Sequence, residues 1–157
     1  MRCVLDEELM DAALEAARVC QAWGDVPIGA VVARDGAVLA SAGNQRERAQ
    51  DPTAHAEILA LRDAAAAAGS WRLDGCDVFV TLEPCAMCAG ALVLARVDRL
   101  VYATPDPKAG FAGSLGDLTR DARLNHRLEV VSGVREAEAS ELLRAFFRGR
   151  RGATEGV

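Results

Sequence analysis

The first part of the chain carries apolar residues at intervals of three and four positions, with acidic residues between them. This periodicity is typical of an amphipathic α-helix, because residues three and four apart lie on the same helix face. We therefore predict an opening helix whose apolar face packs into the core and binds no ligand. The residues on this face are Leu5, Leu9, Ala12, Ala13, Ala16, Val19, Cys20 and Trp23.

Two short apolar runs follow, and the dipeptide Asp35-Gly36 lies between them. An Asp-Gly dipeptide favours a two-residue turn whose twist matches that of antiparallel strands. Residues 28–33 and 37–42 are therefore predicted to form a hairpin.

A second helix is predicted to begin near Thr53 and to end at Gly69. The residues at 51–53 are Asp, Pro and Thr, which are common at helix starts, whereas glycine commonly ends a helix. The sequence His55-Ala-Glu57 falls in the first turns of this helix.

The second half of the chain alternates between strand and helix patterns. Buried strands are predicted at 77–82 and 100–103, with a helix over 84–96 between them. Such a β-α-β unit has parallel strands and a right-handed crossover. A fifth strand over 128–131 and a last helix over 136–148 complete an α/β fold.

The segment 104–116, between the fourth and fifth predicted strands, is rich in proline and glycine. Irregular loops of this length are uncommon in compact domains unless they serve a function. We expect this loop to take part in binding, and a plain surface loop is the alternative.

Length and composition suit one domain over residues 1–157, with a short tail from about residue 150. The start has no apolar signal segment, and the longest apolar stretch, 86–95, is well short of the roughly 20 residues that span a bilayer. Five cysteines, two of them at metal-ligand spacing, fit a reducing compartment better than a disulfide framework. We expect a cytoplasmic protein with no membrane partner.

Charge is distributed unevenly along the chain. The net charge of -5 argues against nonspecific nucleic-acid binding, which normally requires a basic excess. Four arginines nevertheless gather around two phenylalanines near the end. This cluster is either an RNA-facing surface or a solvated helix end, and charge alone favours the second. Its members are Arg144, Phe146, Phe147, Arg148, Arg150 and Arg151.

The strongest chemical signal is His55-Ala-Glu57 combined with Pro84-Cys85-Ala-Met-Cys88. Zinc prefers four nitrogen or sulfur ligands, and a catalytic zinc takes only three from the protein, so that one position stays open for water. Zinc lowers the pKa of this water from about 15.7 toward roughly 7, which supplies hydroxide at neutral pH. Glu57 can then move the protons. This pair of motifs is the established signature of zinc deaminases that act on nucleobases.

The spacing within each motif predicts how the site is built. Cys85 and Cys88 are three apart, so they are neighbours on one helix face, and Pro84 is expected in the first turn of that helix. Both thiolates would then lie near the positive end of the helix dipole. His55 and Glu57, two apart, point about 200° away from each other on a regular helix. We therefore expect the helix to point end-on at the metal, so that His55 ligates and Glu57 reaches the bound water without binding zinc.

A structural zinc site is the alternative, and it would require a fourth Cys or His ligand. The candidates lack paired spacing: Cys3, Cys20 and Cys76 are isolated, and His126 follows a polar loop. The isolated cysteines are interpreted as small core residues.

With these elements placed, nearly the whole chain resembles the bacterial tRNA-specific adenosine deaminases of the cytidine deaminase-like superfamily. The zinc motifs mark only the superfamily, whereas the longer matches around them and the Asp-Pro-Lys and Phe-Phe-Arg segments favour the tRNA-acting branch. The matching segments are 26–31, 51–58, 81–91, 106–110, 113–114, 125–127, 146–148 and 150–151.

The resemblance implies a three-layer α/β/α fold with a central mixed five-stranded sheet. It implies hydrolytic conversion of the wobble adenosine of an arginine tRNA anticodon to inosine, by a homodimer with one Zn²⁺ per subunit and no organic cofactor. A zinc-bound hydroxide held by His55, Cys85 and Cys88 would attack C6 of adenine, with Glu57 as the proton shuttle.

The resemblance also suggests where the tRNA anticodon loop is held. Asn44 would hydrogen-bond the nucleotide, although asparagine is equally common as a turn residue after a strand. Asp106, Lys108 and Phe147 are the candidates for contact with RNA, whose specific recognition targets unstacked bases. Two departures affect these contacts rather than the chemistry, namely Phe111 in place of a small residue and Ala145 in place of an acid.

Two other functions are weighed against this one. A deaminase of a free base or nucleoside would use the same zinc site with a different pocket. The second alternative function is that of a nonenzymatic, zinc-stabilised RNA-binding module. Such a module gains nothing from Glu57, because burying an unpartnered carboxylate beside an open metal position is costly.

Overall fold

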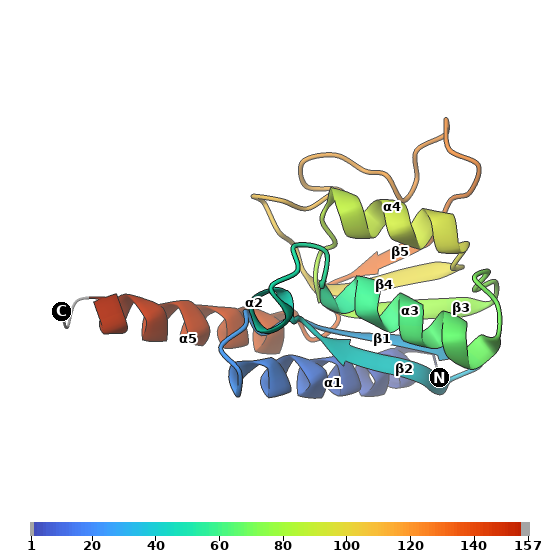
Figure 1. Cartoon of the computed structure of the whole chain (residues 1–157). Helices are drawn as coiled ribbons and strands as arrows, with labels where there is room; N and C mark the ends of the chain where they lie inside the picture. The colour runs from blue at the N-terminus through green and yellow to red at the C-terminus, as the bar shows by residue number, and fades with distance from the viewer. Residues whose placement is uncertain (1, 155–157) are drawn as a thin grey trace.

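Five strands form one mixed sheet in the order β2-β1-β3-β4-β5 (Figure 1). The structure is a computed structural model that describes residues 2–154. β2, β1 and β3 are antiparallel neighbours, whereas β3, β4 and β5 run parallel, so the mixed sheet is confirmed. The strands are β1 (Gly29–Arg34), β2 (Ala37–Gly43), β3 (Cys76–Leu82), β4 (Arg99–Thr104) and β5 (Glu129–Ser132).

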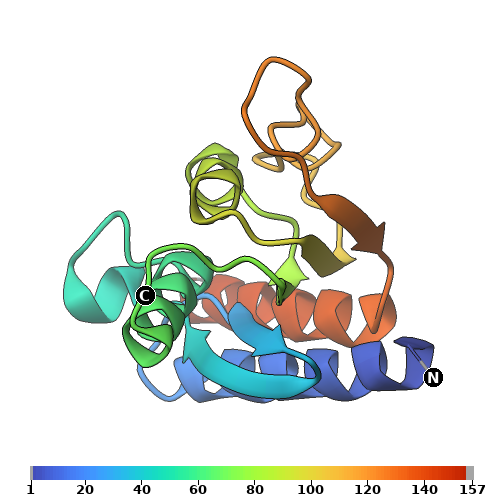
Figure 2. The ribbon, with the colours of Figure 1, turned by 90° about the vertical axis from the view of Figure 1, so that its right-hand side faces the viewer.

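Helices cover both faces of the sheet and give the predicted three layers. α1 (Arg2–Gln21) and α5 (Glu136–Thr154) lie on one face, and α3 (Ala56–Ala68) and α4 (Ala86–Ala95) lie on the other (Figures 1 and 2). A single-turn helix, α2 (Arg46–Ala49), connects β2 to α3 and was not predicted. Within residues 2–154, no helix is both long and apolar enough to cross a bilayer.

The hydrophobic core has two halves, because successive strand residues point to opposite faces of the sheet. One half lies under α1 and α5, and the other lies under α3 and α4. Full burial of a side chain of this size stabilises the fold by about 1.5–3 kcal/mol. Strand residues in the first half are Val31, Phe79 and Val101, and those in the second are Val32, Val78 and Leu100.

Two glycines allow α1 to lie directly against the sheet. A Cβ at Gly29 would stand 1.9 Å from the carbonyl oxygen of Ala13, and a Cβ at Gly43 would stand 2.4 Å from Sγ of Cys20. Both contacts are too short for any other residue. Cys20 is fully buried there, which confirms that it is a core residue and not a ligand.

A buried ion cluster also joins α1 to the sheet. Arg99 of β4 donates two hydrogen bonds to Asp6 of α1, at 2.7 and 2.8 Å, and two to Asp77 of β3, at 2.8 and 3.1 Å. Arg99 and Asp6 are both almost completely buried. Charges that are taken out of water need this kind of pairing, because an unpartnered buried charge is costly.

The predicted hairpin is confirmed, with small shifts in its boundaries. Asp35 and Gly36 have φ values of 51° and 78°, which is the left-handed conformation that a type I′ turn requires at both central positions. Cys76 is a fully buried residue of β3, as expected for a core cysteine. The side chain of Cys3 lies outside those that the structure describes.

Helix starts were predicted less accurately. α3 begins at Ala56 and not near Thr53, because the Asp51 carboxylate accepts hydrogen bonds from the N–H and hydroxyl of Thr53 and makes a local turn there. α4 begins at Ala86, so Pro84 precedes the helix instead of occupying its first turn. α5 continues to Thr154, so residues 150–154 of the expected tail are helical, and 155–157 lie outside the described residues.

Candidate active site

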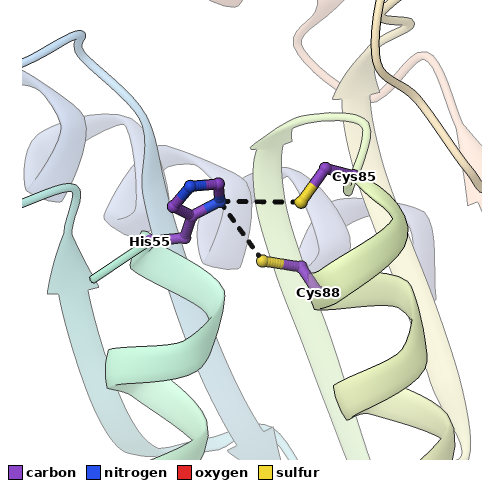
Figure 3. Close-up of side chains that lie close together, drawn as sticks. All are labelled: His55, Cys85 and Cys88. Carbon is purple, nitrogen blue, oxygen red and sulfur yellow. Dashed lines mark hydrogen bonds between the residues drawn. The ribbon is translucent and has the colours of Figure 1, made fainter. Parts of the chain in front are cut away.

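His55, Cys85 and Cys88 meet where α3 and α4 begin (Figure 3). His55 is the residue that caps the start of α3, Cys85 holds the same position on α4, and Cys88 lies one turn further along. Nδ1 of His55 is 3.6 Å from Sγ of Cys85 and 3.5 Å from Sγ of Cys88. The three donor atoms lie within 4.8 Å of one another, so this group could hold a metal ion.

The local fold explains why these side chains converge. A residue that caps a helix start has extended backbone angles, so its side chain leaves along the helix axis instead of along its flank. His55 and Cys85 both have extended backbone conformations, with ψ values of 150° and 177°. Two helix starts that lie side by side therefore direct His55, Cys85 and Cys88 toward one point, where the positive dipole ends favour thiolate.

The two thiols differ strongly in acidity because they share a proton. A hydrogen bond from Cys88 is the main reason why the pKa of Cys85 falls to about 4, and His55 lowers it further. The same hydrogen bond, together with burial, raises the pKa of Cys88. The pair therefore titrates as a unit. A metal would take the place of the shared proton, since cysteine ligates as thiolate.

Glu57 lies in the first turn of α3 and does not belong to this three-residue group. Glu57 is only 4% exposed. Burial raises the pKa of the Glu57 carboxyl, and a hydrogen bond with Cys88 opposes that rise. A buried carboxyl with a raised pKa can hold a proton closer to neutral pH than an exposed carboxyl can, which suits a group that gives and takes protons.

A cavity of about 310 Å³ opens beside this group. Its volume falls within the range of small-molecule sites, which starts at roughly 300 Å³. Among the residues singled out from the sequence, its walls include Asn44, His55, Glu57, Cys85, Asp106 and Phe147. They come from the loops after β2, β3 and β4, from the start of α3 and from α5.

Two predicted site residues lie outside the walls of this cavity. Cys88 is fully buried behind them. Lys108 lines a neighbouring hollow of about 400 Å³ that shares Phe147 and Arg150 with the main cavity. The structure thus brings seven of the eight predicted residues to one centre and puts Lys108 at its rim.

Asn44 is 5% exposed and holds the turn after β2. Its side-chain N–H donates to the carbonyl of Val26 at 3.2 Å, and its side-chain oxygen accepts from the N–H of Arg46 at 3.2 Å. The role as a turn residue is therefore present. The same amide lines the cavity and retains a second N–H and a second lone pair.

The fourth-ligand candidates for a structural zinc do not join the group. Cys20, Cys76 and His126 are not members of it, and His126 is instead hydrogen-bonded to the carbonyl of Val97 at 2.6 Å. The described residues thus give an arrangement of three ligands rather than four.

Two buried carboxylates near the cavity were missed from the sequence. Asp25 is fully buried and caps α2 by accepting hydrogen bonds from the N–H groups of Glu47 and Arg48, at 2.8 and 3.0 Å. Glu83 lines the cavity and binds the loop after β4. The sequence signal that could have found them is an acidic residue next to an apolar segment. Asp25 stands directly before Val26-Pro27, and Glu83 stands directly before Pro84.

Comparison with known proteins connects this geometry to a family. A family model described as MafB19-like deaminase matches residues 5–151. The tRNA-specific adenosine deaminase of Bacillus subtilis (strain 168) is 49% identical over 143 residues, which cover 91% of this chain and 89% of that protein. The chain belongs to the tRNA-specific adenosine deaminase family. The protein of the same name from Agrobacterium fabrum is 46% identical over 142 residues, covering 90% and 93% of the two chains.

Solved structures share the fold of this chain. A structure from studies of A-to-I editing by tRNA deaminases at the wobble position of transfer RNA has a TM-score of 0.84 and 44% identity, and covers 87% of this chain and 99% of that chain. The guanine deaminase of Nitrosomonas europaea has a TM-score of 0.77 and 27% identity, with 89% and 83% coverage. The expected family, fold and enzyme class are therefore confirmed: this member of the tRNA-specific adenosine deaminase family is a deaminase.

Proposed function

We propose that the protein is a zinc-dependent deaminase that converts the wobble adenosine of an arginine tRNA anticodon to inosine. The observation that carries this proposal is the group of His55, Cys85 and Cys88, which could hold a metal, together with the buried Glu57. His55, Glu57 and Cys85 line the same cavity. A relative at 49% identity is named a tRNA-specific adenosine deaminase. The net reaction consumes water and releases ammonia as adenosine becomes inosine.

The donor set fits Zn²⁺. One imidazole nitrogen and two cysteine sulfurs are zinc ligands, and three protein ligands are typical of a catalytic site. When bound, zinc would supply Lewis-acid chemistry and lower the pKa of a water molecule toward neutrality. We propose one zinc per subunit, held by His55, Cys85 and Cys88.

Glu57 would move the protons of the reaction. It is buried, lines the cavity and lies outside the ligand group. In this role its carboxylate takes a proton from the attacking water, gives it to a ring nitrogen of adenine, and later transfers a proton to the leaving ammonia. Asn44 would hold the nucleotide with the part of its amide that the turn leaves unused.

The rim of the cavity suits a splayed nucleic-acid strand. Phe147 is 43% exposed and borders both hollows, so a base can stack on it. Lys108 and Arg151 line the outer hollow, where a phosphate backbone would lie. We propose that Asp106, Lys108 and Phe147 contact the anticodon loop, in spite of the net negative charge of the chain.

We further propose a homodimer through the outer face of α3 and α4. Trp71 and Leu94 are 63% and 69% exposed on this face, beside an apolar hollow of about 240 Å³. Contiguous exposed apolar surface of this kind marks an interaction site, and aromatic residues are enriched in such interfaces. The reaction and the reduced cysteines suit the cytoplasm, which we propose as its location.

One incubation tests the proposed function. Zinc-loaded protein is mixed with an arginine tRNA that bears adenosine at the wobble position and, in parallel, with adenosine, cytidine and guanine, and inosine and ammonia are measured. Inosine at the wobble position of the tRNA alone is expected. The likeness to a guanine deaminase makes a free base the second candidate, and ammonia from guanine with untouched tRNA would favour it.

Salt provides an independent test of substrate class. RNA affinity is expected to fall steeply between about 50 and 200 mM salt, because phosphate contacts release counterions, whereas a neutral base is nearly indifferent to salt. RNA binding without any product after prolonged incubation would instead support a nonenzymatic binding module.

A further inference from the structure

Glu83 is a buried carboxylate between β3 and the cysteine segment, and zinc-site chemistry does not account for it. Glu83 is 2% exposed. The Glu83 N–H continues the ladder between β3 and β4 by donating to the carbonyl of Thr104 at 2.9 Å, which fixes the backbone beside the loop after β4. Burying a carboxylate is costly unless several donors satisfy it.

The donors all come from that loop. Oε1 of Glu83 accepts from the N–H of Asp106 at 3.1 Å and from the hydroxyl of Ser114. Oε2 accepts from the N–H of Ala112 at 3.0 Å and from the N–H of Ser114 at 3.1 Å. One carboxylate therefore binds the loop near its start and again several residues later.

The loop is also paired directly with the segment that carries Cys85. Gly110 forms a β-bridge with Cys85, and the N–H of Phe111 donates to the carbonyl of Pro84 at 2.8 Å. A Cβ at Gly110 would lie 2.2 Å from Oε2 of Glu83, so only glycine permits this approach. The loop, at the start of α4 in Figure 1, is thus held in one register against the cysteines.

The fastened segment contains the residues that face the substrate. Asp106 and Ala109 line the main cavity, and Lys108 lines the outer hollow. The Asp106 carboxylate accepts hydrogen bonds from the N–H groups of Lys108 and Ala109, at 3.0 and 3.3 Å, so the three residues form one turn. Fixing Asp106 from behind therefore fixes the turn as a whole.

We propose that Glu83 is a positioning residue that ties the segment from Asp106 to Ser114 to the metal-ligand segment, and so presents Asp106 and Lys108 to the RNA. The inference rests on the proposed function for its RNA part only. Holding the loop in advance lowers the conformational entropy lost when RNA binds, so Glu83 acts on substrate binding rather than on the chemical step.

Glu83→Gln tests this role with little change in shape. An amide has one acceptor oxygen and an NH₂ group, so it would direct donors at N–H groups that need an acceptor. Glu129→Gln is the matched control, because Glu129 is an exposed carboxylate on β5. Ser114→Ala is the second variant, since it removes one hydroxyl from the same cluster and keeps Glu83 in place.

The first measurement is amide hydrogen exchange over residues 105–116, which does not depend on activity. In Glu83→Gln, exchange there is expected to accelerate by about tenfold or more, because hydrogen bonds to a charged acceptor are lost. Ser114→Ala should show a smaller increase, and Glu129→Gln none. Equal exchange rates in wild type and Glu83→Gln would refute the attachment of the loop by Glu83. If Glu83→Gln does not fold, Ser114→Ala decides, and an exchange rate equal to that of wild type would refute it.

The second measurement is deamination of an anticodon stem-loop RNA, together with zinc content. Glu83→Gln is expected to raise KM by about tenfold, which corresponds to one such hydrogen bond, with kcat and zinc content nearly unchanged. An unchanged KM despite faster exchange would mean that Glu83 only stabilises the loop, and it would overturn the positioning role. A loss of zinc, or a fall in kcat with no change in KM, would also overturn it. Wild-type protein whose loop exchanges slowly but that deaminates no RNA would refute the proposed function and, with it, the presentation of Asp106 and Lys108 to RNA. The attachment of the loop by Glu83 would then be judged by hydrogen exchange alone.

Discussion

Glu57→Gln isolates proton transfer from metal binding. Glutamine has nearly the size of glutamate, so it fills the same buried position in the first turn of α3. It cannot take up or release a proton at neutral pH. Because Glu57 lies outside the group of His55, Cys85 and Cys88, the variant is expected to keep one zinc per subunit.

The expected loss follows from what general acid–base catalysis contributes. A positioned acid or base is worth about 10²–10⁴ in rate, which is roughly 3–5 kcal/mol of barrier. Two other carboxylates line the cavity, but Glu83 binds the loop through four donors and Asp106 organises its own turn. Neither can replace Glu57, so we expect a loss in the upper half of this range.

The assay is single-turnover formation of inosine in an anticodon stem-loop RNA, with zinc measured in the same preparation. Glu129→Gln, an exposed carboxylate change, controls for handling and should match wild type. Loss of zinc from Glu57→Gln would make Glu57 a ligand and refute the division of roles. A rate within about tenfold of wild type would show that another group moves the protons.

Three further predictions concern the metal, the ion cluster and the apolar face. Cys88→Ala should bind no zinc. At free zinc about 100-fold above the wild-type Kd, the variant should lack the roughly 2.7 kcal/mol that zinc binding adds to the free energy of unfolding, which thermal melts with and without chelator check. Equal zinc content in Cys88→Ala and wild type would contradict the ligand assignment. Arg99→Met should lower the free energy of unfolding by about 3–5 kcal/mol in urea titrations, because it leaves the Asp6 carboxylate buried without its partner. Adding Asp6→Leu to the same chain should recover much of this loss. A loss below about 1 kcal/mol would mean that the ion cluster contributes little to stability. Trp71→Arg should weaken self-association by about 30-fold or more in sedimentation experiments, because the loss of an exposed aromatic residue at an interface commonly has an effect of this size. Wild-type protein that sediments as a monomer would refute the dimer proposal.

The sequence predicted this fold well where one local rule decides the structure. The Asp35-Gly36 turn needs two residues that tolerate positive φ, so the dipeptide alone indicates where the hairpin turns. The β-α-β unit around the cysteines follows from period and length alone. The cysteines themselves were found because metal-ligand spacing survives as a short pattern in the chain.

The errors occurred where a distant residue changes the local preference. The single turn of α2 is too short to stand on its own propensity, and it is capped by Asp25, which lies more than twenty residues earlier in the chain. The start of α3 was placed too early because the side chain of Asp51 satisfies Thr53 in a turn rather than in a helix. The role of Glu83 depends on a loop that approaches it only in the folded protein.

The mixed sheet explains why these pieces form one site. β3 and β4 are parallel, so their carboxyl ends and the loops beginning at Glu83 and Pro105 lie at the same edge, as ligand sites of parallel sheets do. β1 runs antiparallel to β3 and β2 antiparallel to β1, so the end of β2 with Asn44 reaches that edge too. α3 and α4 then begin there and bring together His55, Cys85 and Cys88. One edge of the sheet therefore carries the whole site, while the core behind it is shared with a guanine deaminase at 27% identity and a TM-score of 0.77.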